Sequence, residues 1–224
     1  MSIWFKIEIK KRLSEICKKM GFKKKQNVFI MPYSENVLAI LFFSVDELWE
    51  PGNVSVSVSV GVTYKDVEEL YHKLCEVDKS LFTHTIWEQI GYLMPEKFYK
   101  EWNFLEGSDN TYVYEDILKC IQTYGFDFYD RMKDFNNLLR AFEIRTPCLL
   151  NISRDRRLPI LYYLNGEKEK GLKVIEEAIA RQKQPVDKTP TIKPRGAEVV
   201  VIVGSGYGKV DPTYLKFVKK YKAL

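Results

Sequence analysis

The chain has 224 residues, of which 46% are hydrophobic and 29% charged, and these proportions are ordinary for a folded globular protein. Aromatic residues make up 14%, which supplies enough large side chains for a core without metal or disulfide staples. The longest nearly apolar run, residues 37–45, is too short to cross a bilayer as a helix. The N-terminus has no signal-peptide pattern, so the sequence disfavours membrane and secreted classes.

The four cysteines are far apart and form no CxxC pair. They are Cys17, Cys75, Cys120 and Cys148. Such spacing is typical of free, mostly buried thiols in a reducing compartment. The sequence therefore predicts a cytoplasmic protein with no membrane partner.

The net charge of +5 is concentrated in residues 1–25, where nine Lys or Arg stand against two Glu. Apolar residues recur among these charges at helical spacing, which predicts a helix over about residues 2–20 with Gly21 as its C-terminal cap. The basic side chains should form a solvated helix face, and a patch for nucleic acid or an acidic partner is the alternative. The predicted buried stripe comprises Trp4, Ile9, Leu13, Ile16, Cys17 and Met20.

Three strands are predicted next, over residues 28–33, 37–45 and 53–64, and their short connections favour an antiparallel meander. The third strand alternates strictly, NVSVSVSVGVTY, so its valines share one face and its Ser, Gly and Thr residues share the other. We expect the valine face to pack on helices, chiefly the first one. The second face has hydroxyls and little bulk, which suits close packing better than catalysis.

Beyond these strands the pattern becomes increasingly helical. Thr63 is expected to cap a helix, and two more strands are expected over residues 81–90 and 98–105. A helix should end at Gly125, and a single helical stripe then follows over residues 128–142. The apolar stripe of the helix after Thr63 is Val67, Leu70, Tyr71 and Leu74.

Together these elements predict an α+β fold: a mainly antiparallel four- to five-stranded sheet, with an N-terminal helix packed on it and a helical C-terminal half. Residues 1–182 are expected to form one domain, with a sheet part at about 1–105 and a helical part at about 106–182. Proline-rich residues 183–197 read as a linker, and residues 198–224 as a strand-turn-helix arm.

The C-terminal arm places an apolar strand before the glycine-rich residues 204–208, as phosphate-binding loops do. However, Lys209 stands where a dinucleotide fingerprint needs Gly, and Val203 and Val210 occupy key places of a Walker loop. A strand, a turn and a short helix opening at Asp211 are therefore expected. The apolar strand should add to its own sheet or exchange into a second copy, which would give a homo-oligomer.

Catalytic and metal-binding patterns are weak throughout the chain. The residues His72, Cys75, Asp78 and His84 have only a loose resemblance to a metal-ligand spacing. Two histidines supply little acid–base or triad chemistry. We therefore expect no catalytic residue, no cofactor and no metal, although an enzyme with an unrecognised site stays an alternative.

Two short segments are candidates for contact with a partner. An acidic loop carries a Trp, a common anchor in interfaces, and an arginine cluster opens a helix, where positive charge is slightly unfavourable. A hairpin loop folded back on the sheet and a solvated turn are the alternatives for these two segments. The candidate residues are Asp46, Glu47, Trp49, Glu50, Arg154, Arg156 and Arg157.

Scattered short motifs over roughly residues 1–180 resemble an uncharacterised bacterial family, a domain of unknown function that recurs near polymorphic-toxin and immunity genes. None of them is catalytic. The resemblance implies a stand-alone α+β protein that binds another protein. The motifs are GFKKK at 21–25, NVF at 27–29, Gly61-Val62, Ile90-Gly91 with Trp102, and YYLNG at 162–166.

The sequence thus favours a non-enzymatic protein-binding module, of immunity or adaptor type, whose partner is another protein. The alternative is a nucleic-acid-binding protein that uses the basic N-terminal helix. Affinity that falls steeply with salt would be its signature.

Overall fold

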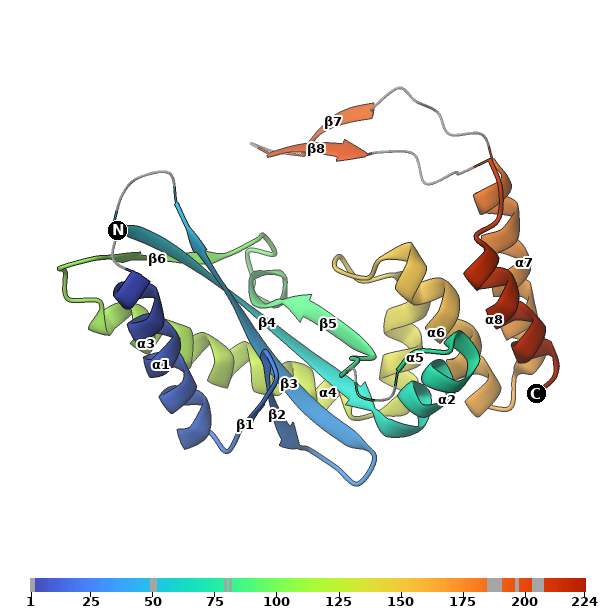
Figure 1. Cartoon of the computed structure of the whole chain (residues 1–224), viewed down its shortest axis with the longest axis horizontal. Helices are drawn as coiled ribbons and strands as arrows, with labels where there is room; N and C mark the ends of the chain where they lie inside the picture. Colours follow the sequence, from blue (N-terminus) through green and yellow to red (C-terminus); the bar gives the residue numbers. More distant parts are fainter. Residues whose placement is uncertain are drawn as a thin grey trace. The chain divides into compact units, whose positions relative to one another are not determined.

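The computed structural model describes residues 3–48, 52–78, 80, 82–184, 191–195, 198–202 and 208–224. The fold is α+β as predicted, with a six-stranded antiparallel sheet, the N-terminal helix α1 (Ile3–Lys19) and a helical C-terminal half (Figure 1). The chain divides into two compact units. The first comprises residues 1–69 and 80–150, and the second comprises residues 70–79 and 151–224.

Helix α1 ends as the sequence predicts. Gly21 has φ +92°, the Gly21 N–H donates to the Lys18 carbonyl, and the Phe22 N–H donates to the Cys17 carbonyl. This pair of bonds is a Schellman cap, which satisfies carbonyls that the helix end would leave free. One residue of the predicted stripe is misplaced: Trp4 is 78% exposed, because the first turn of α1 does not reach the core.

The sheet has the order β1-β2-β3-β4-β5, and β6 also pairs with β4. The first residues of β4 pair with β6 and its later residues pair with β5, so β4 is central along its whole length. The sequence analysis missed the short first strand. The bounds are β1 (Lys23–Lys25), β2 (Val28–Pro32), β3 (Val37–Glu47), β4 (Asn53–Tyr64), β5 (Ile86–Gln89) and β6 (Glu101–Leu105).

Both faces of β4 are buried from Val54 to Tyr64. On the valine face the helical segment after β6 comes close, since a Cβ on Gly125 would lie 3.3 Å from Val60 Cγ1. On the other face Phe42 and Trp87 meet edge to face with centroids 5.6 Å apart, and they stand opposite Ser59 and Gly61. Small residues on the central strand therefore make room for large rings on its neighbours.

The helices of the first unit differ from the prediction at two points. The helical segment that begins at Thr111 continues through Gly125, because this residue forms part of the π-helix η2 and keeps φ −69°. Residues 128–142, which were predicted to form one helical stripe, belong to two helices. The second one starts at Asp134, whose side chain accepts the Asn137 N–H at 3.0 Å. The bounds are α3 (Thr111–Cys120), η2 (Ile121–Gly125), α4 (Phe126–Met132) and α5 (Phe135–Ile144), with the 3-10 turn η1 (Ile90–Leu93) after β5.

Thr63 does not cap the following helix. It is the penultimate residue of β4, and its hydroxyl donates to the Thr83 carbonyl at 2.9 Å. The Tyr64 N–H donates instead to the Thr85 hydroxyl, also at 2.9 Å. The strand thus leads directly into α2 (Lys65–Cys75), because Thr83 and Thr85 supply hydrogen-bond partners for its last two residues.

The second unit is helical and contains a hairpin of two helices, which turns at Gly166 with φ +76°. The terminal helix opens at Pro212 behind Asp211, whose side chain accepts the Thr213 N–H, as predicted. The apolar strand of the arm pairs with a strand that lies inside the predicted linker. The bounds are α6 (Asn151–Leu164), α7 (Lys168–Lys183), β7 (Thr191–Arg195), β8 (Glu198–Ile202) and α8 (Pro212–Lys222).

Candidate functional site

One edge of the sheet in the first unit is incompletely paired. Strand β3 has eleven residues, but β2 pairs only with its segment Leu38–Leu41. Strand β2 begins after the two-residue turn Gln26-Asn27, which connects it to β1. Beyond this turn β3 continues to Glu47 with β4 on one side only. Within the described residues, no strand occupies the other side.

Two backbone hydrogen bonds fix which backbone groups face this open side. The Leu48 N–H donates to the Asn53 carbonyl at 3.1 Å, and the Tyr33 N–H donates to the Val37 carbonyl at 2.9 Å. Because bonding alternates with every residue of a strand, even-numbered residues of β3 bond to β4 and odd-numbered residues face the lane of β2. Phe43, Val45 and Glu47 therefore direct their N–H and C=O groups outward along the open edge.

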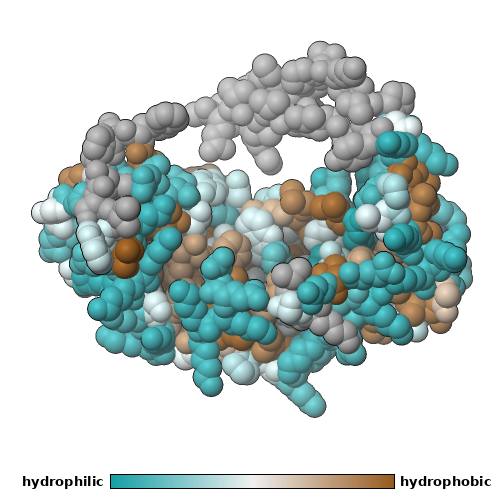
Figure 2. All heavy atoms as spheres, in the orientation of Figure 1, coloured by the Kyte–Doolittle hydropathy of each residue, from teal (hydrophilic) through white to brown (hydrophobic). Residues whose placement is uncertain are grey.

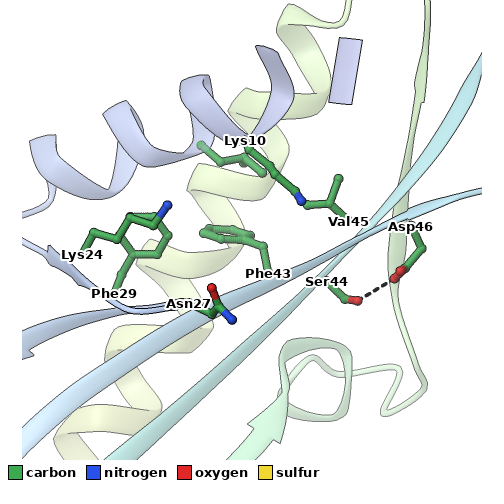
Figure 3. A pocket seen from close by; sticks show the side chains of 9 residues that line it. Lys10, Lys24, Asn27, Phe29, Phe43, Ser44, Val45 and Asp46 are labelled. Atoms are coloured by element: carbon green, nitrogen blue, oxygen red, sulfur yellow. Dashed lines mark hydrogen bonds between the residues drawn. The ribbon is translucent and has the colours of Figure 1, made fainter. Parts of the chain in front are cut away.

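A groove of about 370 Å³ follows this edge on the side of α1. Its floor is apolar: Phe29 and Phe43 meet edge to face with centroids 5.9 Å apart, and Leu13 and Val45 are buried beside them. Figure 3 shows the two rings together on the floor of the groove, with Val45 farther along β3. Backbone groups that no described strand pairs with and an apolar floor thus lie side by side.

The rim of the groove is basic. Lys10 reaches in from α1 and Lys24 from β1 (Figure 3), and both side chains are exposed. Neither lysine forms an ion pair with any described residue. Ser44 and Asp46 also line the groove at its end along β3, and the Asp46 carboxylate accepts a 2.5 Å hydrogen bond from the Ser44 hydroxyl. The rim therefore presents two positive charges that the described chain does not neutralise.

The predicted acidic segment falls partly on this edge. Asp46 and Glu47 are exposed at the end of β3, which extends two residues farther than predicted. Trp49 and Glu50 lie outside the described residues. Hydrophilic residues cover most of the face seen in Figure 2.

The predicted arginines belong to the second unit, on α6. Arg156 is buried, bonds to Asp211 at 3.3 Å and to the Thr213 hydroxyl at 3.1 Å, and lies over the Tyr214 ring. Arg157 is buried with its guanidinium 3.9 Å from the centre of the Tyr71 ring. Arg154 is half-buried. Partners within the unit, which were not predicted from the sequence, thus hold two of the three arginines.

Other reactive groups of the described chain are not arranged around a common centre. Burial raises the pKa of the Cys17 thiol to about 12 and that of Cys148 to about 11, so both thiols carry their protons at neutral pH. In the part of the chain that the structure describes, no three His, Cys, Asp or Glu side chains gather as a metal site would require. No helix there is long and apolar enough to cross a membrane.

Comparisons with protein-family models, with curated proteins and with solved structures found no match for this chain. The resemblance to a bacterial domain family therefore stays a prediction.

The sequence analysis missed the open edge, although a signal for it exists. The predicted strands at residues 28–33 and 37–45 differ in length and are joined by a tight connection. In an antiparallel pair the longer strand must then extend beyond its partner. The basic residues of the groove were predicted to form a solvated helix face, with a patch for nucleic acid or an acidic partner as the alternative.

Proposed function

We propose that this protein is a non-enzymatic protein-binding module that takes up an extended segment of its partner as an added strand beside β3. The open edge at Phe43, Val45 and Glu47 carries the proposal. An immunity-type or adaptor role in the cell is one form that such binding would take. Strand addition is a common mode of peptide recognition, in which the main chain gives affinity and side-chain pockets give specificity.

The energetics favour a bound strand. Three edge residues offer six backbone groups, and each hydrogen bond contributes about 0.5–1.5 kcal/mol net. The floor adds apolar contact, at about 25 cal/mol for each Å² removed from water. Natural sheets usually block long open edges with prolines, bulges or a covering element. Here β3 runs without a bulge or a proline from Phe43 to Glu47, and Phe43 and Val45 are apolar next to a groove.

Substitution of Glu47 by proline tests the contribution of the edge. Glu47→Pro removes one outward N–H and places a ring in the lane, whereas the inward bonds to β4 come from even-numbered residues and are kept. The matched control Glu47→Ala removes the same charge but keeps the N–H. We expect an alternating Thr/Val peptide with a central Phe to bind Glu47→Ala as it binds the unsubstituted protein, and to bind Glu47→Pro about tenfold more weakly.

Amide hydrogen exchange on the full chain gives the direct readout. Bound peptide should slow exchange at Phe43, Val45 and Glu47, while Ser44 and Asp46 should change little because their N–H groups already face β4. If no peptide slows exchange at the three edge amides, strand addition is wrong. Retention on heparin that is lost steeply with salt, without any such protection, would favour the nucleic-acid alternative.

A further inference from the structure

The groove favours particular side chains in the added strand, besides the backbone hydrogen bonds that the edge of β3 offers. Resting on the strand-addition proposal, we infer that the added strand is an acidic segment in which an apolar residue stands between Asp or Glu residues at alternate positions. Charge complementarity and the spacing of the groove residues carry this inference. It commits to a heterologous acidic peptide as the occupant.

Alternation along the strand sets the motif. Side chains at every second position of an added strand point to the same face, and those on the α1 side enter the groove. Phe29 of β2 already occupies the position opposite Leu41, so the central one of these side chains lies opposite Val45 and meets the apolar floor there. The next ones, about 6.6 Å to either side, lie opposite Phe43 and Glu47, and Lys10 and Lys24 extend into the groove from its rim. A carboxylate on each flank of an apolar residue therefore matches the site.

The charges of the groove support an anionic partner. Lys10 belongs to α1 and Lys24 to β1, and no described carboxylate pairs with either of them. Asp46 also lines the groove, and its carboxylate accepts a hydrogen bond from Ser44, so the two lysines outnumber the one acidic side chain of the lining. An acidic strand would thus gain two ion pairs beside an apolar floor, where the local dielectric is lower than in open solvent.

A second copy of the chain fits the groove less well. Two β3 edges paired around a twofold axis would place both α1 helices on the same face of the joined sheet. Both basic rims would then lie on that one face, and the chain carries a net charge of +5. Like charges brought together disfavour this pairing.

Three peptides with one alternating Thr/Val scaffold and a central Phe separate the possibilities. They carry Glu, Gln or Lys at the positions two before and two after the Phe. We expect the Glu peptide to bind the full chain about tenfold more tightly than the Gln peptide, and the Lys peptide to bind most weakly. This preference should shrink between 50 and 300 mM salt because the rim lysines are exposed.

Neighbouring lysines provide matched controls. Lys10→Glu and Lys24→Glu should each abolish the preference for the Glu peptide over the Gln peptide. Lys11→Glu and Lys23→Glu change the net charge equally, but these exposed residues do not line the groove, so the preference should survive. Thermal melting of all four variants verifies that each is folded.

The outcomes distinguish this inference from the proposed function. If the three peptides bind equally and still protect the edge amides, strand addition stands and the acidic motif is wrong. If no peptide protects those amides, the proposed function fails as well. Equal loss in the Lys10 and Lys11 variants would show that net charge acts without the groove, and a concentration-dependent dimer that blocks the peptide would identify a second copy as the occupant.

Discussion

At the level of single residues, Glu88 on β5 is a buried carboxyl whose hydrogen bonding is incomplete. It is 2% exposed, its Oε1 accepts the Cys148 N–H at 3.1 Å, and its Oε2 has no hydrogen-bond partner. Burial raises the pKa of this carboxyl above its ordinary 4.5, and the neighbouring Thr146 hydroxyl and Cys148 only partly oppose the shift. The proton is thus held more tightly in the folded protein than in the unfolded chain.

This shift gives a pH dependence of stability. Because the folded state binds the proton more tightly, the free energy of unfolding should fall as pH rises from about 4.5 through the raised pKa. Glu88→Gln imitates the protonated form, so it should flatten this part of the profile and stabilise the protein at pH 7 by about 1–3 kcal/mol. Urea unfolding between pH 4.5 and 8 measures both effects. Glu101→Gln, at an exposed site on β6, should keep the original slope; a parallel change in both variants would contradict the assignment to Glu88.

At the level of elements, helix α6 contains Pro159, which cannot donate an N–H to the carbonyl of Asp155. Helix α8 compensates: the Tyr214 hydroxyl donates to the Asp155 carbonyl at 3.2 Å, and the Tyr221 hydroxyl donates to the Pro159 carbonyl at 2.9 Å. The Tyr221 ring fits beside Gly171 of α7, where a Cβ would lie 2.0 Å from its hydroxyl oxygen. A proline in one helix is therefore matched by tyrosines in another.

A double-mutant cycle tests this compensation. Tyr214→Phe keeps the ring but leaves the Asp155 carbonyl without its donor, so it should destabilise the protein by about 1 kcal/mol. With Pro159→Ala the helix regains an N–H for that carbonyl, and the effect of Tyr214→Phe should then be much smaller. Chemical denaturation followed by helical circular dichroism gives the four free energies. Additive effects would mean that the hydroxyl does not serve the carbonyl freed by Pro159.

The elements that the sequence predicted well are those with a local cause. The Schellman end at Gly21, the Asp211-Pro212 helix start and the alternation of Asn53–Tyr64 depend on neighbours in the chain. The passage through Gly125 depends on packing against Val60, which no local pattern shows. The open edge of β3 likewise depends on where β2 begins, so only the relative strand lengths pointed to it.

At the scale of the whole molecule, the sequence predicted the α+β class because periodicity changes from two to 3.6 along the chain. It did not predict the partners of the buried arginines, because Arg156 meets Asp211 and Thr213 more than fifty residues away in sequence. Nor did it predict the groove, since residues from α1, β1 and β3 form it together. Long-range pairing thus decided both the candidate site and the burial of the predicted arginine cluster.

The terminal helix α8 contributes four buried side chains to the second unit. Tyr214, Phe217, Val218 and Tyr221 are buried, and full burial of one large side chain contributes about 1.5–3 kcal/mol. Deletion of residues 184–224 should therefore lower the melting temperature of the second unit clearly. All four tryptophans fall in residue ranges of the first unit, so their fluorescence follows that unit while circular dichroism at 222 nm follows the helices of both.

We expect the deletion to shift the dichroism transition to lower temperature. An unchanged dichroism transition would contradict a structural role for α8, because the buried tyrosines and Phe217 would then add nothing to stability. A tryptophan transition that moves by the same amount would show that the two units unfold as one cooperative block. The substitution Leu215→Ala provides the control, since this residue of α8 is 48% exposed and its truncation should change melting little.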